Sequence, residues 1–575
     1  MNSDFPIYTI ENECQDCYKC VRHCHCKAIR IVNARAAVIP ELCVSCGECF
    51  KVCPAHAKKI RSDLRRAKYW MEQGETVYAS VAPSFLGFFP EVTLQQLAAG
   101  LKRLGFSGAS ETALGAQLVS SENHKILERM PAGVYLSSAC PAAVEYVGKY
   151  APQWKDAILP VASPVVAHAK YLRKCFGEQI KVVFFGPCAA KKNEADRYPE
   201  TLSLALTFQD LIAWMEEEKV NLSELPPEDP VPVMAEEGRR YSLEGGMNDT
   251  MRVPGDGIQY VAVSGLENID RMLRGADRKK VARDGGKLFI EMLSCHGGCV
   301  NGPVMAEEAS GVETIMKTSQ FSVEKTSVGR SVPVDLSLPV EVQRVQETPR
   351  EEFLIRAAME SVGKFSVKDE LNCGGCGYNT CREFARAMVE GKAEAGMCLS
   401  WLRKISQRTS NALIRYIPAA VVIVDQELQI LECNRHFAKL AGADTLETYD
   451  TFGNLTGAYL DKIVPYVELF QMVLEKGGEI ERSNQMYGER IYDISIFTIT
   501  QGRTVGAVIQ DVTQTELRRE QVAEKAREVI RKNVLTVQNI ARCLGEHMAE
   551  TEILLNQVAS TYENHEVDEK SAGIK

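Results

Sequence analysis

The chain has 575 residues, of which 45% are hydrophobic and 25% are charged, a composition typical of a globular protein with several domains. Its formal net charge of −9 argues against nucleic acid as a main partner, because binding to phosphates needs a basic face. No stretch reaches the roughly 18 consecutive apolar residues of a membrane span, and the first residues lack the basic start of a signal peptide. We therefore expect a cytoplasmic protein without a membrane partner, whose cysteines stay reduced and bind metal.

Two runs of cysteines lie within residues 1–60, each with the spacing CxxCxxCxxxC. In chain order the eight residues are Cys14, Cys17, Cys20, Cys24, Cys43, Cys46, Cys49 and Cys53. The doubled run resembles a bacterial two-cluster ferredoxin, in which the last cysteine of each run binds the other cluster. The resemblance implies two 4Fe–4S clusters, one on Cys14, Cys17, Cys20 and Cys53 and the other on Cys24, Cys43, Cys46 and Cys49. A pair of zinc ribbons is the alternative, but such sites lack this cross-ligation.

Residues 76–325 mix short apolar strands with amphipathic helices, which is the pattern of an α/β domain. Four apolar segments each run into a loop: TVYASV, GVYLSS, KVVFFG and KLFIEML. Three of these loops carry cysteines, namely Cys140, Cys188 and the pair Cys295 and Cys299. Ligands usually bind at strand ends in such layers, so these loops form the candidate site.

The same region resembles the large subunit of the FeFe-hydrogenases in four segments that occur in the family's order: SSACP, SPVVAHAKYL, GPCAAKKNEA and EMLSCHGGCVNG. The resemblance implies a 4Fe–4S subcluster on Cys140, Cys188, Cys295 and Cys299. It also implies a diiron subcluster with CO, cyanide and an azadithiolate, bridged by Cys299. Lys191 would hydrogen-bond a cyanide, and the pocket would be lined by Ser163, Pro164 and Pro187. Cys299 and Lys191 are thus the predicted catalytic residues, for the interconversion of H2 with protons and electrons.

The chain departs from that family at several pocket positions. Ala139 replaces a cysteine that passes protons to the azadithiolate, and such a relay contributes roughly 10²–10⁴-fold, so we expect slow turnover. Two methionines that touch the diiron site in the family are Gly186 and Leu293 here, and Gly302 is followed by Pro303. These departures resemble the sensory branch of the family. The alternative is a hydrogenase-like protein without a diiron site, similar to the eukaryotic iron–sulfur assembly factors.

A third set of cysteines follows a polar, proline-containing stretch at 326–350, which fits a linker. Residues 351–402 contain CGGCGYNTC and a later GMC, and they resemble the small 4Fe–4S domain of corrinoid and electron-transfer proteins. The ligands implied are Cys373, Cys376, Cys381 and Cys398. Zinc is the alternative because the last spacing is wide.

The C-terminal part changes in pattern twice. Residues 408–512 are rich in strands and resemble a PAS domain, on IPAAVVIVDQELQILECNRHFAKLAG and AVIQDVTQTELRRE. We expect no PAS cofactor, because His436 is the only histidine there and fits the surface. Residues 513–560 predict a coiled-coil-like signalling helix that pairs with another helix through Val522, Ala526, Val529, Asn533, Val537, Ala541 and Leu544. Four cysteines match no ligand pattern and are expected to be buried free thiols: Cys26, Cys175, Cys433 and Cys543.

We therefore predict a multidomain α+β and α/β protein. Its parts are a two-cluster ferredoxin domain, an H-cluster domain, a small helical Fe–S domain, a PAS domain and a C-terminal signalling helix. The predicted function is an iron–sulfur sensor of H2 or redox state with slow hydrogenase chemistry. The expected partners are H2 and protons, an electron carrier such as ferredoxin, an output phosphatase or kinase, and a second copy of the chain. The alternatives are a metabolic ferredoxin-linked hydrogenase and a non-catalytic electron-transfer or scaffold protein.

Overall fold

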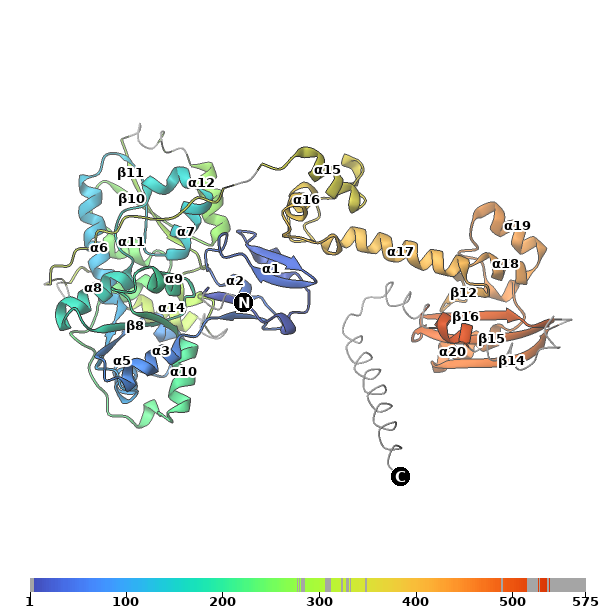
Figure 1. Ribbon diagram of the computed structural model, residues 1–575, viewed down its shortest axis with the longest axis horizontal. Coiled ribbons are helices and arrows are strands. Elements are labelled where there is room, and N and C mark those ends of the chain that lie inside the picture. Colours follow the sequence, from blue (N-terminus) through green and yellow to red (C-terminus); the bar gives the residue numbers. More distant parts are fainter. Residues whose placement is uncertain are drawn as a thin grey trace, which may run out of the picture. The chain divides into compact units, whose positions relative to one another are not determined.

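The computed structural model describes residues 5–276, 278, 280, 285–305, 312–321, 324–326, 330, 332–346, 349–487, 490–513, 526, 528–534 and 537. The chain divides into two compact units, Met1–Met397 and Cys398–Lys575, and each is described by itself (Figure 1). In the described part of the chain, no helix is both long and apolar enough to cross a lipid bilayer.

The N-terminal part of the first unit consists of two antiparallel ribbons and two short helices. The strands pair as β1 (Ile7–Thr9) with β4 (Lys58–Ile60) and β2 (Ile29–Val32) with β3 (Arg35–Val38). The helices are α1 (Lys19–His23) and α2 (Glu48–Lys51), each starting within a cysteine run. Tyr18 and Gly47, just before these helices, have φ angles of 54° and 84°. The left-handed backbone there turns each cysteine loop into its helix.

Two parallel sheets follow, with strand orders β6-β5-β8-β9 and β10-β11-β7. The strands are β5 (Val77–Val81), β6 (Gly108–Glu111), β7 (Gly133–Leu136), β8 (Lys181–Gly186), β9 (Leu204–Thr207), β10 (Ile258–Ser264) and β11 (Lys287–Leu293). The four apolar segments predicted to be strands are β5, β7, β8 and β11, so that prediction is confirmed. Most of their residues are buried, which explains why the segments are almost continuously apolar.

Helices surround these sheets (Figure 1). They are α3 (Leu64–Glu72), α4 (Phe85–Phe88), α5 (Leu94–Arg103), α6 (Thr112–Arg129), α7 (Pro141–Tyr150), α8 (Pro164–Phe176), α9 (Ala190–Arg197), α10 (Phe208–Glu217), α11 (Gly246–Met251), α12 (Leu266–Gly275) and α14 (Val312–Ser319). One hydrophobic core lies around β5 and β8, and another around β7 and β11. The second core also contains Cys26, Ala28 and Val44. Residues 5–60, here called the ferredoxin-like part, therefore pack directly on the sheet β10-β11-β7.

Residues 332–346, here called the strap, differ from the linker expected over 326–350. The backbone of Ala162 donates to the carbonyl of Leu336, and that of Leu338 donates to the carbonyl of Pro160. Leu336 and Val342 are buried, and a Cβ added to Gly148 would lie 2.4 Å from Val342. A few apolar side chains therefore hold the strap on the domain, although its composition is mostly polar.

The first unit ends with two helices that pack together, α15 (Glu352–Ser361) and α16 (Cys381–Val389). The second unit opens with α17 (Leu399–Tyr416) and forms a five-stranded antiparallel sheet of order β13-β12-β16-β15-β14. Its strands are β12 (Ala420–Asp425), β13 (Ile430–Cys433), β14 (Glu479–Tyr487), β15 (Arg490–Thr500) and β16 (Thr504–Asp511), and its helices are α18 (Arg435–Ala441), α19 (Ala443–Phe452) and α20 (Val467–Lys476). The sheet agrees with the strand-rich pattern predicted for 408–512.

The predicted tail helix is described only at residues 513, 526, 528–534 and 537, and its remainder, with Leu544 and Cys543, lies outside the described residues. Residues 526, 528–534 and 537 are helical. Val537 is fully buried in a small core with Ile414 and Val421. This part of the apolar stripe thus packs against α17 and one face of the sheet in its own unit, and pairing of the remaining stripe with another helix stays a prediction.

Candidate metal centres

The eight N-terminal cysteines lie in two groups, and each group mixes the two runs. The thiols whose charges act on Cys20 are those of Cys14, Cys17 and Cys53. Those acting on Cys49 belong to Cys24, Cys43 and Cys46. Burial raises the pKa of Cys20 to about 11 and that of Cys49 well above its ordinary value. The grouping is the one implied by the ferredoxin resemblance, and the role of these thiols as cluster ligands remains a prediction.

The other candidate site lies where the two parallel sheets present their carboxyl ends. Cys140 follows β7, Cys295 follows β11, and Cys188 follows β8 of the other sheet. Burial raises the pKa of Cys188 to about 11 and that of Cys299 to about 12, and the neighbouring thiols add to this. Such thiols stay protonated near neutral pH unless a metal replaces their protons.

These four cysteines line one hollow of about 350 Å³, the thiol hollow, together with Cys46, Pro187, Leu293 and Gly302. Helices α7 and α9 begin next to Cys140 and Cys188, and helix N-termini favour negative charge. Among the described residues, no three His, Cys, Asp or Glu side chains are arranged to hold a single ion, whereas zinc keeps its thiolates about 2.3 Å from the metal. A donor set of four thiols around a wider hollow fits an anionic iron–sulfur cluster.

Lys191 lies in α9 and is brought together with Ser163. Its Nζ is 3.1 Å from Ser163 Oγ and 2.6 Å from Glu194 Oε2. The Lys191 charge also acts on the thiols of Cys188 and Cys299. Sequence reasoning missed Glu194, although it stands in the GPCAAKKNEA motif, and a buried ammonium needs such a partner. Both predicted pocket prolines have defined places. Pro187 lines the thiol hollow, and Pro164 begins α8 directly after Ser163.

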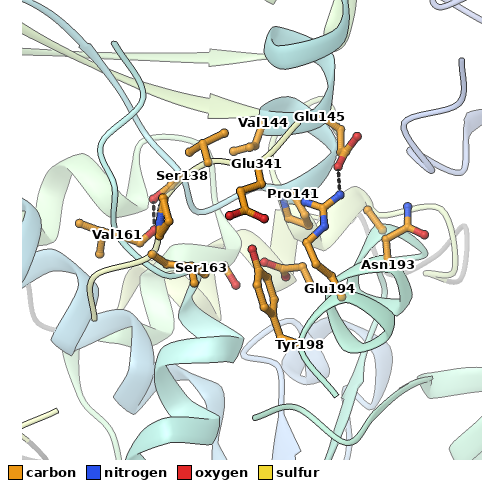
Figure 2. Close-up of a pocket in the computed structure, with 15 residues that line it drawn as sticks. Ser138, Pro141, Val144, Glu145, Val161, Ser163, Asn193, Glu194, Tyr198 and Glu341 are labelled. Atoms are coloured by element: carbon orange, nitrogen blue, oxygen red, sulfur yellow. Dashed lines mark hydrogen bonds and ion pairs between the residues drawn. The ribbon is translucent and has the colours of Figure 1, made fainter. Parts of the chain in front are cut away.

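A second hollow of about 550 Å³, the polar hollow, lies beside Ser138 and Ser163 (Figure 2). Ser138 Oγ donates to the carbonyl of Val161 at 2.6 Å. Three carboxylates line the hollow, from Glu145, Glu194 and Glu341, and the first forms an ion pair with Arg197. Burial raises the pKa of Tyr198, and Glu341 of the strap contributes to the shift. Polar groups therefore lead from the strap to the Ser163–Lys191 pair.

The departures noted in the sequence have visible structural consequences. Ala139 packs partly buried against the main core, so the first cysteine loop presents no titratable side chain at this position. A Cβ on Gly186 would lie 2.4 Å from the Phe184 ring. The ring therefore fills the space that a larger side chain at position 186 would need. A Cβ on Gly47 would likewise lie 2.4 Å from Pro303. The loop after β11, which carries Cys295 and Cys299, therefore touches the N-terminal cysteine loop at Gly47, next to Cys46.

The ferredoxin-like loop is anchored by hydrogen bonds as well. Lys149 Nζ donates to the carbonyl of Cys43 at 2.7 Å, and Tyr150 Oη donates to the carbonyl of Leu42 at 2.6 Å. Asn193 Nδ2 donates to Ser45 Oγ at 2.8 Å. Side chains of α7 and α9, the helices that begin at the thiol hollow, thus fix the loop that carries Cys43 and Cys46.

The third cysteine set contributes Cys373, Cys376 and Cys381 to the first unit, whereas Cys398 begins the second unit. The charges of Cys376 and Cys24 both act on Tyr378, whose pKa is raised mainly by burial. The Tyr378 hydroxyl is buried and has no hydrogen-bond partner among the described residues. A buried hydroxyl needs an acceptor, and a thiolate of either cysteine set would supply one. Lys27 Nζ lies 6.0 Å from the centre of the same ring.

Two hydrogen bonds from backbone N–H groups join the N-terminal part of the first unit to the segment that follows α16. The backbone N–H of Asn33 donates to Glu394 Oε1 at 2.6 Å, and that of Ile31 donates to the carbonyl of Lys392 at 2.9 Å. A Cβ on Gly377 would lie 3.0 Å from Val21. The cysteine loop before α16 is therefore docked on the ferredoxin-like part, on the side of Cys24.

The cysteines outside the ligand patterns behave in part as expected. Cys26 and Cys433 are buried in hydrophobic cores, whereas Cys175 is only half-buried and thus differs from the expected buried thiol. Cys175 stands in the last turn of α8, next to Phe176 and the helix end, where one side remains open. His436 is exposed, as expected.

Comparison with known proteins identifies three regions. Residues 75–303 match the model of the iron only hydrogenase large subunit, C-terminal domain. Residues 36–59 match a 4Fe-4S binding domain, and residues 369–400 match a putative Fe-S cluster domain. Residues 75–303 are therefore similar to an iron-only hydrogenase large-subunit domain, and two further regions are similar to iron–sulfur domains. These matches imply 4Fe–4S clusters and an H-cluster.

Individual relatives are similar over part of their length. The NADP-reducing hydrogenase subunit HndD of Solidesulfovibrio fructosivorans is 25% identical over 54% of this chain and 66% of that protein. Iron hydrogenase 1 of Clostridium pasteurianum is 26% identical over 43% of this chain and 53% of that protein. The chain thus spans between half and two thirds of the length of these relatives.

Among solved structures, a variant of the FeFe-hydrogenase HydA1 from Chlamydomonas reinhardtii aligns with 47% of this chain and 92% of its own, at 20% identity and a TM-score of 0.37. The PAS domain of a histidine kinase aligns with 16% of this chain and 98% of its own, at 19% identity and a TM-score of 0.12.

Proposed function

We propose that this protein is an iron–sulfur sensor of H2 or redox state with slow hydrogenase chemistry. The observation that supports it best is twofold. All four predicted ligands line the thiol hollow, and position 139 carries an alanine. The hollow fits the cluster, while the alanine removes the proton carrier that fast turnover needs. A metabolic hydrogenase would need the carrier, and a scaffold would not need the buried Lys191.

The chain's own residues would hold and orient the H-cluster. Cys140, Cys188, Cys295 and Cys299 would ligate it, with Cys299 shared between its two parts. When bound, the cluster supplies an iron centre at which H2 is made or split. Lys191, held by Ser163 and Glu194, would direct its ammonium toward anionic ligands of that centre, as a charge-assisted donor does. The apolar lining from Pro187 and Leu293 would exclude water.

Protons would reach the site through the polar hollow. Its carboxylates lie between the strap and the Ser163–Lys191 pair, and Glu194 can hold a proton at its Oε atoms. No side chain continues this route at position 139, because alanine carries no exchangeable proton. Water would have to complete the path there, which is the physical reason for slow turnover.

Electrons would follow the contacts among the cysteine groups. Cys46 lines the thiol hollow and belongs with Cys24 to one thiol group. Cys24 and Cys376 both lie near Tyr378, since the charges of both thiols act on its hydroxyl. We propose that the Cys24 cluster exchanges electrons with the H-cluster and with the cluster predicted for the third cysteine set, of which Cys376 lies near Tyr378. A ferredoxin-type carrier would serve as the external electron partner.

The output would come from the second unit, which we propose to be a PAS domain without a cofactor of its own. Asn434 fits this role, because its side chain joins α17, β12 and α18 through four hydrogen bonds of 2.7–3.0 Å. The tail helix would pass the signal to a phosphatase or kinase within a homodimer. We also propose that the protein works in the cytoplasm, where thiols stay reduced.

The test is to expose the anaerobically matured protein to H2 and to follow two readouts together. EPR spectroscopy reports reduction of the 4Fe–4S clusters, and gas chromatography reports turnover with a chemical electron donor. We expect complete cluster reduction with turnover at least about 100-fold below a matched hydrogenase that keeps its relay cysteine. Equal turnover would contradict the sensor, and clusters that stay oxidised under H2 would contradict hydrogenase chemistry. The variant Cys188→Ser, which removes one ligand, is the control.

A further inference from the structure

Lys58 is a buried lysine in the middle of the ferredoxin-like part. It lies in β4, directly opposite Thr9 of β1, and it is 1% exposed. Its Nζ is 2.6 Å from Thr9 Oγ1. In the part of the chain that the structure describes, no carboxylate forms an ion pair with Lys58. A buried ammonium with a single neutral partner is costly unless a negative charge lies close to it.

The groups that surround Lys58 belong to both cysteine groups. Burial raises the pKa of Cys20 to about 11, and among the charges acting on this thiol that of Lys58 is the largest and lowers the pKa. The same charge lowers the pKa of Cys49, again against a larger effect of burial, and it acts on Cys24 as well. Strand β4 packs against α2, which carries Cys49, and α2 packs against α1, which carries Cys20, so the ammonium lies near both thiol groups.

The negative charge that Lys58 needs would come from the two clusters. A 4Fe–4S cluster with four thiolate ligands is anionic, and reduction adds one more negative charge. A fixed positive charge beside it therefore stabilises the reduced form more than the oxidised form and raises the reduction potential. Thr9 Oγ1 accepts a hydrogen bond from the ammonium, which holds the charge near both thiol groups.

We propose that Lys58 is the shared counter-charge of the two ferredoxin-type clusters and raises the reduction potential of both. The proposal rests on the proposed function only in requiring that both thiol groups hold clusters. It deepens that function, because clusters of raised potential retain the electrons that they receive. A sensor gains from this, since the reduced state outlasts a brief exposure to H2.

The experiment compares reduction potentials in full-length protein whose iron–sulfur clusters are reconstituted anaerobically with iron and sulfide. Lys58→Met keeps length and apolar volume but removes the charge, and Lys58→Arg keeps the charge. The matched control is Lys59→Met, which removes the neighbouring, half-exposed ammonium 3.6 Å from Glu13. Iron content and the EPR signal of two neighbouring reduced clusters establish that each variant is folded and loaded.

We expect Lys58→Met to raise the oxidised-to-reduced ratio of both clusters roughly tenfold at a given applied potential, which is a decrease of about 59 mV for a one-electron couple. Lys58→Arg and Lys59→Met should stay close to the unmodified protein. If Lys58→Met binds both clusters with unchanged potentials, or if only one potential moves, the shared role of Lys58 is wrong while the proposed function stands. If the unmodified protein binds neither cluster, both fail together.

Discussion

The variant Gly47→Ala tests whether the ferredoxin-like loop is seated against the hydrogenase-like loop. Gly47 has a φ of +84°, and an added Cβ would lie 2.4 Å from Pro303 Cγ and 2.5 Å from its Cβ. Ordinary contact begins near 3.4 Å, so one side must move by about 1 Å. A non-glycine residue in this backbone region costs roughly 1–2 kcal/mol, and forcing an extra methyl group into a packed contact costs typically 1–3 kcal/mol. We expect a total loss of about 2–5 kcal/mol.

The matched control is Gly74→Ala. Gly74 has a φ of +72° but nothing within 4 Å of an added Cβ, so only the backbone cost of about 1–2 kcal/mol applies. The double variant Gly47→Ala/Pro303→Gly removes the clash, and its coupling energy should recover about 1–3 kcal/mol. Urea unfolding of the first unit, followed anaerobically by the loss of cluster absorbance, measures each value. The reasoning is refuted if Gly47→Ala costs no more than Gly74→Ala, or if Pro303→Gly recovers nothing.

Three further changes have defined outcomes. Ala139→Cys restores a titratable thiol, so H2 turnover measured by gas chromatography should rise roughly 10²–10⁴-fold; no rise would contradict the relay argument. Asn434→Ala removes the hydrogen bonds to Ile414, Ala419, Val421 and Phe437. The free energy of unfolding of the second unit, measured in urea, should fall by about 3 kcal/mol. In the control His436→Ala, which alters an exposed residue, the same free energy should change by less than about 0.5 kcal/mol. Burial raises the pKa of Glu291 to about 8, so the stability from its protonated form is complete below about pH 4.5 and is lost as the pH rises through 8. The variant Glu291→Gln should lose less stability between pH 5 and pH 8, and an equal loss would show that Glu291 is not the titrating group.

The cysteine motifs could be predicted from the sequence because ligand spacing is a local property. The loops after β7, β8 and β11 follow from apolar strands ending at Cys140, Cys188 and Cys295. The mixing of the two N-terminal runs is what the ferredoxin resemblance implies, and the structure groups Cys53 with Cys20.

What the sequence did not reveal depends on contacts between distant segments. Nothing in the string KKI marks Lys58 as buried rather than exposed like a typical lysine. Val342 lies in a polar, proline-containing stretch, yet it is buried and packs closely against Gly148. The stripe residue Val537 packs against Ile414 of α17 and against the sheet of its own unit, which its position in the stripe does not reveal. Helical periodicity identifies an apolar face without identifying what covers it.

The most direct test of the central claim is infrared spectroscopy of the anaerobically matured protein, in the region where iron-bound CO and cyanide absorb. A hydrogenase matured in parallel is the positive control, and Cys299→Ser is the ligand-loss control. The account predicts CO and cyanide bands that shift under H2 in the unmodified protein and are absent in Cys299→Ser. If the unmodified protein shows no such bands while the parallel hydrogenase does, the site holds no diiron centre and the proposed H2 chemistry is wrong.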